Sequence, residues 1–167
     1  MKRKGAKVRS RKGERIRDAS GALVLFVAQK KSVSADVGEK SMDENEISKV
    51  IVTAAIEVHR TLGGPGLLES VYEEALAYEL TRMGCNVQRQ VPSPISYKGV
   101  TLATPLKIDL LVNELVIVEC KAVGQYNKIF ESQTLTYLRL RNLKLGLVVN
   151  FGENLVKDGI HRVVNGL

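Results

Sequence analysis

Two acids and a lysine lie within or at the end of apolar runs in residues 106–122. Asp109 interrupts the first run, and Glu119 and Lys121 end the second. Burying an acid among Leu, Ile and Val is costly unless a cation or strong hydrogen-bond donors meet it. These three side chains could converge on a cation, and the stretch is therefore a candidate metal site.

Two strands joined by a turn fit this pattern. Because side chains alternate along a strand, Glu119 and Lys121 share one face and Cys120 takes the other. We expect Cys120 to be a small core residue there.

The position of Asp109 depends on the loop between these strands. Asp109 lies opposite Glu119 only if Val112 pairs with Val116 across the three-residue loop 113–115. A two-residue turn would instead send the two acids to opposite faces. The metal site therefore requires the three-residue loop.

The acids predict a particular chemistry. Asp109 and Glu119, joined by Glu69 and the Cys120 carbonyl, would supply hard oxygen ligands suited to Mg2+ or Mn2+. Such an ion polarises a phosphodiester oxygen and activates water, and Lys121 could orient that water or steady developing charge. The reaction class would be phosphodiester hydrolysis.

Two amphipathic helices precede these strands. The first begins after Met42, has acids in its first turn and carries apolar residues at helical spacing over 47–62. Gly63 and Gly64 end it, and a second apolar stripe runs over 68–83. Glu69 and Tyr72 fall on one side of this second helix. The spacing leaves two interpretations of Glu69 equally open, a partly buried site acid or a first-turn acid answering the helix dipole.

The remaining elements follow from local pattern. Residues 87–97 contain two prolines and predict an edge strand or broken ribbon. Residues 129–141 predict a third helix, on which Gln133 and Tyr137 share a face as ordinary polar residues. Residues 145–151 predict a central strand buried on both faces, and a short strand or helical turn follows, ending at Val164.

Charge and composition divide the chain of 167 residues into two parts. Residues 1–41 hold 12 Lys and Arg against 4 acids, whereas residues 42–167 hold 13 against 14. We interpret 1–41 as a basic, disordered extension and 42–167 as one domain with one core. Met42 is a second candidate for the natural first residue. The nearly neutral domain makes the overall basic charge poor support for DNA binding by the domain itself.

Export and membrane insertion are both disfavoured. The apolar run 22–28 is short for a secretory signal and far short of a membrane span. Two distant cysteines without a C-x-x-C motif indicate a reduced, cytoplasmic protein and argue against zinc.

The acids and lysine also resemble a known signature. Asp109, followed after nine residues by Glu119-x-Lys121, resembles the acid, acid-x-Lys signature of the PD-(D/E)XK nuclease superfamily, although Ile108 replaces the proline of its name. The chain from Met42 onward is similar to the GxxExxY proteins, in the segments HRTLGGPGLLESVYEEAL, VECKAV and TYLRL.

This resemblance implies a fold and a set of roles. The implied fold is an α/β restriction-endonuclease-like core, a four-stranded mixed sheet flanked by helices in the order αβββαβ. The implied roles are the following: Glu69 as first-helix acid, Asp109 and Glu119 as metal ligands, Lys121 as catalytic lysine, and Gln133 with Tyr137 as a site-supporting helix pair, while Tyr72 completes the name motif.

Two functions of different class follow. The first is a metal-dependent nuclease that hydrolyses nucleic acid, with DNA expected. The second is a catalytically silent module that keeps the fold to bind nucleic acid or a protein partner, including a second copy of the chain. Neither pattern nor resemblance defines the substrate.

Overall fold

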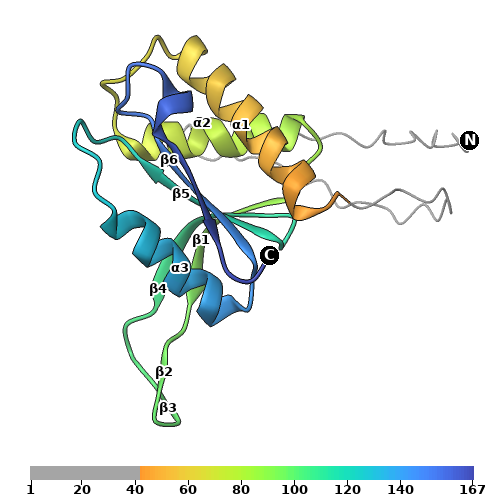
Figure 1. Cartoon of the computed structure of the whole chain (residues 1–167), viewed down its shortest axis with the longest axis vertical. Coiled ribbons are helices and arrows are strands. Elements are labelled where there is room, and N and C mark those ends of the chain that lie inside the picture. The colour runs from red at the N-terminus through yellow and green to blue at the C-terminus, as the bar shows by residue number, and fades with distance from the viewer. Residues whose placement is uncertain (1–41) are drawn as a thin grey trace, which may run out of the picture. The chain divides into compact units, whose positions relative to one another are not determined.

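The structure, a computed structural model, describes residues 42–167. The predicted extension 1–41 lies outside the described residues. Within them the chain folds into helices packed on a mixed sheet (Figure 1). The helices are α1 (Glu44–Thr61), α2 (Glu69–Arg82) and α3 (Ile129–Arg141), with a 3-10 turn η1 (Val156–Gly159). The strands are β1 (Val87–Ser93), β2 (Ser96–Tyr97), β3 (Val100–Thr101), β4 (Leu106–Val112), β5 (Val116–Lys121), β6 (Leu145–Asn150) and β7 (Ile160–Val164).

The main sheet has five strands in the order β1-β4-β5-β6-β7, and only the β5–β6 pair is parallel. The predicted fold class is confirmed, with one more strand than the four predicted. The additional strand is β7, which pairs with β6. Every residue of β6 is buried, as predicted for a central strand, and a central strand needs a partner along each edge.

The first turn of α1 explains where this helix begins. Asp43 accepts a hydrogen bond from the Glu46 backbone N–H, and the Glu46 carboxylate accepts one from the Asp43 N–H. This reciprocal capping satisfies two backbone donors that a helix end otherwise leaves unpaired. The apolar stripe of α1 then faces inward, with Ile47, Ile51 and Ala54 fully buried.

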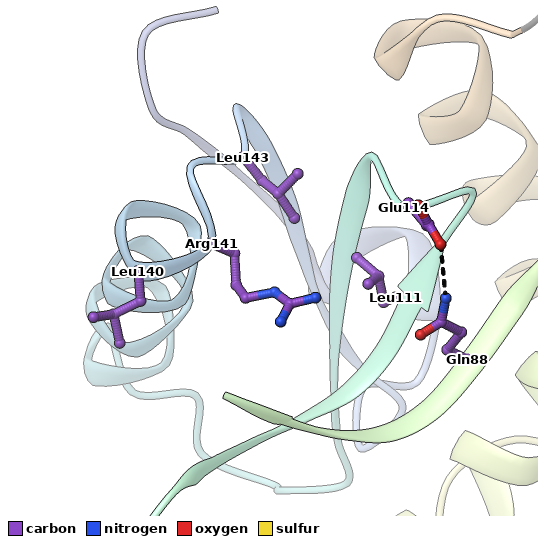
Figure 2. A pocket seen from close by; sticks show the side chains of 6 residues that line it. All are labelled: Gln88, Leu111, Glu114, Leu140, Arg141 and Leu143. Carbon is purple, nitrogen blue, oxygen red and sulfur yellow. Dashed lines mark hydrogen bonds between the residues drawn. The ribbon is translucent and has the colours of Figure 1, made fainter. Parts of the chain in front are cut away.

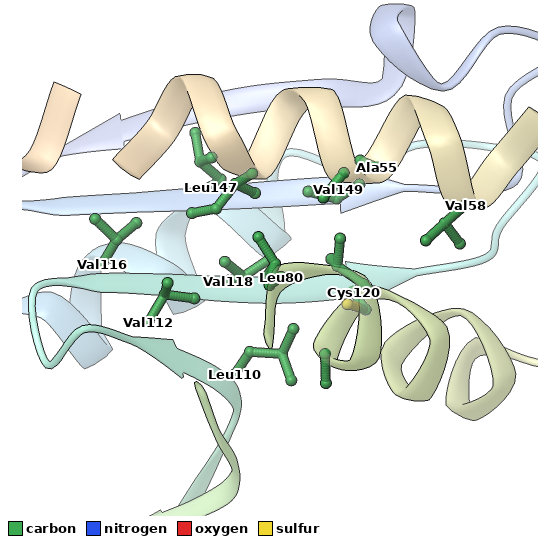
Figure 3. Packing of buried hydrophobic residues seen from close by; sticks show 14 of the residues in the cluster. Ala55, Val58, Leu80, Leu110, Val112, Val116, Val118, Cys120, Leu147 and Val149 are labelled. Atoms are coloured by element: carbon green, nitrogen blue, oxygen red, sulfur yellow. The ribbon is translucent and has the colours of Figure 1, made fainter. Parts of the chain in front are cut away.

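Helices cover both faces of the sheet. On one face, α1 and α2 enclose a core that includes Val118 and Cys120 of β5 and Val149 of β6 (Figure 3). On the other, Leu138 of α3 packs against Ile117 and the neighbouring strands. Cys120 is therefore a core residue, as predicted. Val58 of α1 and Leu80 of α2 belong to the same core cluster as Val118 and Cys120.

Within residues 42–167, no helix is both long and apolar enough to cross a membrane. The two cysteines, Cys85 and Cys120, are buried and free of disulfides.

Candidate active site

The loop between β4 and β5 has the predicted length. Val112 pairs with Val116 across residues 113–115, and the ladder continues to the Leu110–Val118 pair. Asn113 and Glu114 adopt left-handed conformations, with φ of 51° and 60°. The predicted loop and its Val112–Val116 pair are thus confirmed, but the ladder ends one residue before Asp109 and Glu119 would pair.

The two strands separate where the acids stand. The β4–β5 ladder ends at the Leu110–Val118 pair, whereas β5 stays paired with β6 as far as Lys121. Ile108 packs on the α3 side of the sheet, but Leu110, two residues later, packs on the α1–α2 side. Residues two apart in a regular strand share a face, so β4 changes face at Asp109. Beside the end of this ladder, Glu69 of α2 contacts Lys121 at the end of β5.

One ammonium group joins side chains from three elements. Lys121 Nζ lies 3.7 Å from Glu69 Oε1, 3.7 Å from Asp109 Oδ2 and 3.6 Å from Glu119 Oε2. The same Nζ donates a hydrogen bond of 2.7 Å to the Cys120 carbonyl. The three carboxylates come from α2, β4 and β5. The three acids that the sequence indicated therefore surround the same ammonium group.

The partners of Lys121 are the four oxygen groups expected to bind a metal ion. Among residues 42–167, no three His, Cys, Asp or Glu side chains form a group able to hold a metal as they stand. The ammonium contacts the oxygens instead. The donor set still fits a hard divalent cation, because it consists of three carboxylates and a carbonyl.

The acids keep Lys121 charged. Burial lowers the pKa of Lys121, but the charges of Asp109, Glu119 and Glu69 outweigh burial and raise the pKa above its ordinary value. A lysine with a raised pKa stays protonated at neutral pH. Lys121 is therefore a cation and hydrogen-bond donor here, and is unsuited to act as a general base.

Glu119 is the most deeply buried acid of the group. Its side chain is only 7% exposed, and its Oε1 is a buried atom with no hydrogen-bond partner in the described part of the chain. Burial and the Asp109 charge raise the pKa of Glu119 to about 8, despite Lys121. Burial, in part offset by Lys121, also raises the pKa of Glu69. An unpaired buried oxygen beside two more acids is a place where a cation would be stabilised.

Asp109 accepts hydrogen bonds from groups that no sequence pattern indicated. Its Oδ2 accepts a hydrogen bond of 3.0 Å from the Cys120 N–H, and its Oδ1 accepts one of 3.4 Å from Gln90 Nε2. The same Gln90 nitrogen donates to buried Glu73 at 2.6 Å, and Arg89 Nε also donates to Glu73 at 3.1 Å. A glutamine thus links an α2 acid to Asp109.

The backbone at Gln90 is unusual. Gln90 has a φ of 53°, in the left-handed region. The β1–β4 ladder pairs Arg89 with Leu110 and Val91 with Ile108, and leaves out the Gln90–Asp109 level between them. The side chain of Gln90 therefore reaches both acids at the cost of backbone strain.

In a strand, an alanine variant is usually more stable than a glycine variant. The strain at Gln90 predicts the opposite order there. We expect Gln90→Gly to be more stable than Gln90→Ala by about 1 kcal/mol, because only glycine adopts this φ freely. Both variants should be less stable than wild type by about 1–3 kcal/mol, because buried Glu73 loses a partner. Urea unfolding measures both differences.

Gln88 on the same strand is the matched control, since its φ is not positive. There Ala should be more stable than Gly, as is usual in a strand. If the alanine variant were also the more stable one at position 90, the left-handed conformation of Gln90 would not reduce the stability of the protein.

Helix α3 brings one of its two predicted residues near the acids. Burial, followed by the charges of Glu119 and Asp109, raises the pKa of Tyr137. Lys121 Nζ lies 5.6 Å from the ring centroid of Phe130, on the same helix. Gln133 is exposed, and its side chain makes no hydrogen bond within residues 42–167. The charges of the acids therefore act on Tyr137, whereas Gln133 faces outward.

Tyr72 holds the segment that precedes Glu69. Its ring is fully buried and stacks on Phe151 at 4.6 Å. Its hydroxyl donates to the Gly64 carbonyl at 2.7 Å and accepts from the Leu67 N–H at 3.2 Å. Tyr72 therefore fixes the loop that leads into α2, whose first residue is Glu69.

A pocket of about 380 Å3 lies elsewhere, between β1, the β4–β5 loop and the end of α3 (Figure 2). None of the predicted site residues lines it; its lining is Gln88, Leu111, Glu114, Leu140, Arg141 and Leu143. The candidate site is thus defined by convergent charge, and this pocket is separate from it.

The fold and the convergent acids define the class of a nuclease-like α/β domain. A family model described as PD-(D/E)XK nuclease superfamily matches residues 45–163, and the chain belongs to that superfamily. Neither the curated proteins nor the solved structures include a significant match.

Proposed function

We propose that this protein is a metal-dependent nuclease that hydrolyses phosphodiester bonds of nucleic acid, with DNA as the expected substrate. The observation that carries the proposal is the cluster around Lys121 Nζ, where the acid side chains of Glu69, Asp109 and Glu119 and the Cys120 carbonyl surround one ammonium group. Membership of a nuclease superfamily supports the same chemistry. The similarity of 42–167 to GxxExxY proteins is part of the proposal.

The metal-binding groups would be Asp109, Glu119 and Glu69 with the Cys120 carbonyl. Mg2+ or Mn2+ bound there would polarise a phosphodiester oxygen and lower the pKa of a water molecule. The buried Oε1 of Glu119 supports the assignment, because it has no hydrogen-bond partner within residues 42–167, and a divalent cation could replace the proton that the raised pKa keeps on this acid. Gln90 and the Cys120 N–H orient Asp109.

Lys121 supplies the positive charge that the reaction needs. Its raised pKa keeps it protonated, so it would orient the attacking water by hydrogen bonding and stabilise negative charge growing on the phosphate. Tyr137 would donate a hydrogen bond at the edge of the site, since its raised pKa keeps its hydroxyl protonated. Gln133, exposed on the same helix, is proposed to contact substrate directly.

Cleavage assays with and without metal test the proposal. Purified protein is incubated with single-stranded, duplex and branched DNA and with RNA, in EDTA or with added Mg2+ or Mn2+. We expect cleavage only with metal. Asp109→Asn should weaken Mn2+ binding and lower cleavage, while Asp158→Asn, at an exposed position in η1, should leave both unchanged.

Two outcomes would decide against this function. Cleavage that persists in EDTA would remove the metal from the mechanism. Binding of nucleic acid or of a protein without cleavage of any substrate would favour the alternative, a silent module in which Lys121 permanently neutralises the acids.

A further inference from the structure

The β2–β3 hairpin is a closed and exposed structure. Ser96 pairs with Thr101 and Tyr97 with Val100 around a two-residue turn, Lys98-Gly99. Both turn residues have positive φ, 49° and 82°, as tight hairpin turns require. The hairpin extends from β1 and β4, away from the helices (Figure 1).

The side chains of the hairpin take no part in the core. Tyr97 is 60% exposed, Val100 65% and Leu102 43%. Neither core cluster contains a residue of β2 or β3. Exposed apolar side chains gathered on one short element commonly mark a binding surface.

The charge around the hairpin is positive. Residues 90–108 contain Lys98 and Lys107 and no acid, although residues 42–167 as a whole hold more acids than bases. Lys98 Nζ lies 5.5 Å from the ring centroid of Tyr97. An aromatic face beside a cation suits a nucleotide, whose base stacks on the ring while its phosphate meets the ammonium.

The hairpin is also continuous with the candidate active site. β1 leads into it from Gln90, and β4 leads out of it toward Asp109. The last pair of the β1–β4 ladder, Ser93 with Leu106, stands three residues before Asp109, or roughly 10 Å along the strand. On the same scale the tip at Lys98, eight residues beyond Gln90, lies at most roughly 26 Å from the level of Asp109, which corresponds to about eight nucleotides of helical rise.

We propose that the β2–β3 hairpin is a second contact for the nucleic acid, where Tyr97 stacks on an unpaired base and Lys98 binds a neighbouring phosphate. This contact lies several nucleotides from the phosphodiester held by the acids. The inference rests on the proposed function for its substrate class, but binding at the hairpin requires no cleavage and can be measured without it.

Tyr97→Ala in the full chain tests the stacking. Binding of a fluorescent, single-stranded oligothymidylate is measured by anisotropy in EDTA, at two salt concentrations. We expect the dissociation constant to rise about tenfold, as for loss of one aromatic stacking partner. Lys98→Ala should reduce the salt dependence by about one phosphate contact. Iodouracil in the oligonucleotide should photo-crosslink to Tyr97, as peptide mass spectrometry would show.

Tyr78→Ala is the matched control. Tyr78 on α2 is 64% exposed and has Arg82 at 5.9 Å from its ring centroid, so it repeats the pairing of tyrosine and cation away from the hairpin. Its substitution should change binding less than twofold. The thermal unfolding temperature should be unchanged in both variants, since neither side chain is buried.

Several results would overturn the inference: no binding by the full chain, unchanged binding by Tyr97→Ala, or an equal loss in Tyr78→Ala. Loss of a dimer in Tyr97→Ala, seen by light scattering, would assign the hairpin to a second copy of the chain instead. Failure of the proposed function gives a different pattern, in which wild type binds and crosslinks through Tyr97 but cleaves nothing.

Discussion

Replacement of Lys121 by methionine is expected to lower the cleavage rate at saturating substrate by about 10²–10³-fold, the usual cost of losing one charged donor at a reacting centre. Methionine keeps an unbranched apolar stem beside the Phe130 ring and removes only the ammonium. The fold should therefore persist, as near-native unfolding in urea would show.

The same substitution should strengthen metal binding. Lys121 Nζ contacts every group proposed as a ligand, so in the wild type it competes with a divalent cation for the same oxygens. Isothermal titration with Mn2+ should give a lower dissociation constant for Lys121→Met than for wild type. Tighter metal binding with lost cleavage would separate the chemical role of the lysine from a structural one.

Lys144→Met is the control, because Lys144 is exposed before β6 and outside the cluster. It should cleave and bind metal as wild type does. Equal cleavage by wild type and Lys121→Met, in protein freed of contaminating nucleases, would place the activity elsewhere in the chain.

The part of the site that the sequence predicted depends on strand geometry. Side-chain alternation made the 113–115 loop and the Val112–Val116 pair the condition for a site shared by the two acids, and the structure has both. Residue spacing also predicted α3 with its observed bounds. These features are local consequences of period-two and period-3.6 patterns, which a sequence displays directly.

The parts that escaped prediction depend on tertiary contacts. Nothing in the pattern of β1 indicates that Gln90 adopts a positive φ, or that its amide links Glu73 to Asp109. Strand parity gives the face of Lys121 but not the path of its four-carbon side chain, which turns back to the Cys120 carbonyl. Long flexible side chains settle according to the charges that the fold brings near them.

The fifth strand of the sheet was not predicted for a related reason. Residues 158–164 were open to interpretation as a strand or a helical turn, and both occur: η1 ends at Gly159 and β7 follows from Ile160. The pairing of β7 with β6 resolves the choice. A short segment with ambiguous propensity takes the structure that its neighbour can pair with.

Replacement of Glu119 by glutamine is expected to stabilise the metal-free protein, and to do so more at high pH than at low pH. The folded protein holds a proton on Glu119 up to a pKa of about 8, whereas the unfolded chain releases it near the ordinary value of about 4.3. Between these values the unfolded state binds fewer protons, so rising pH favours unfolding. Because glutamine does not titrate, the Glu119→Gln variant does not lose this stability as the pH rises.

The difference in the free energy of unfolding between the two proteins should depend on pH with a defined slope. For one proton, the free energy of unfolding of wild type should fall relative to Glu119→Gln by about 1.4 kcal/mol for each pH unit below the folded pKa. Urea unfolding in EDTA at about pH 6 and about pH 9 should therefore show a difference that grows by roughly 2–3 kcal/mol. Above the folded pKa the two curves should run parallel.

Glu74→Gln is the control for the pH series, since its side chain is 74% exposed. Its stability should follow wild type at every pH. If the stability of Glu119→Gln also followed wild type from pH 6 to pH 9, then Glu119 would be ionised throughout that range in the folded protein. The charge of Lys121 would then be enough to hold Glu119 ionised, and the raised pKa of Glu119 would be wrong.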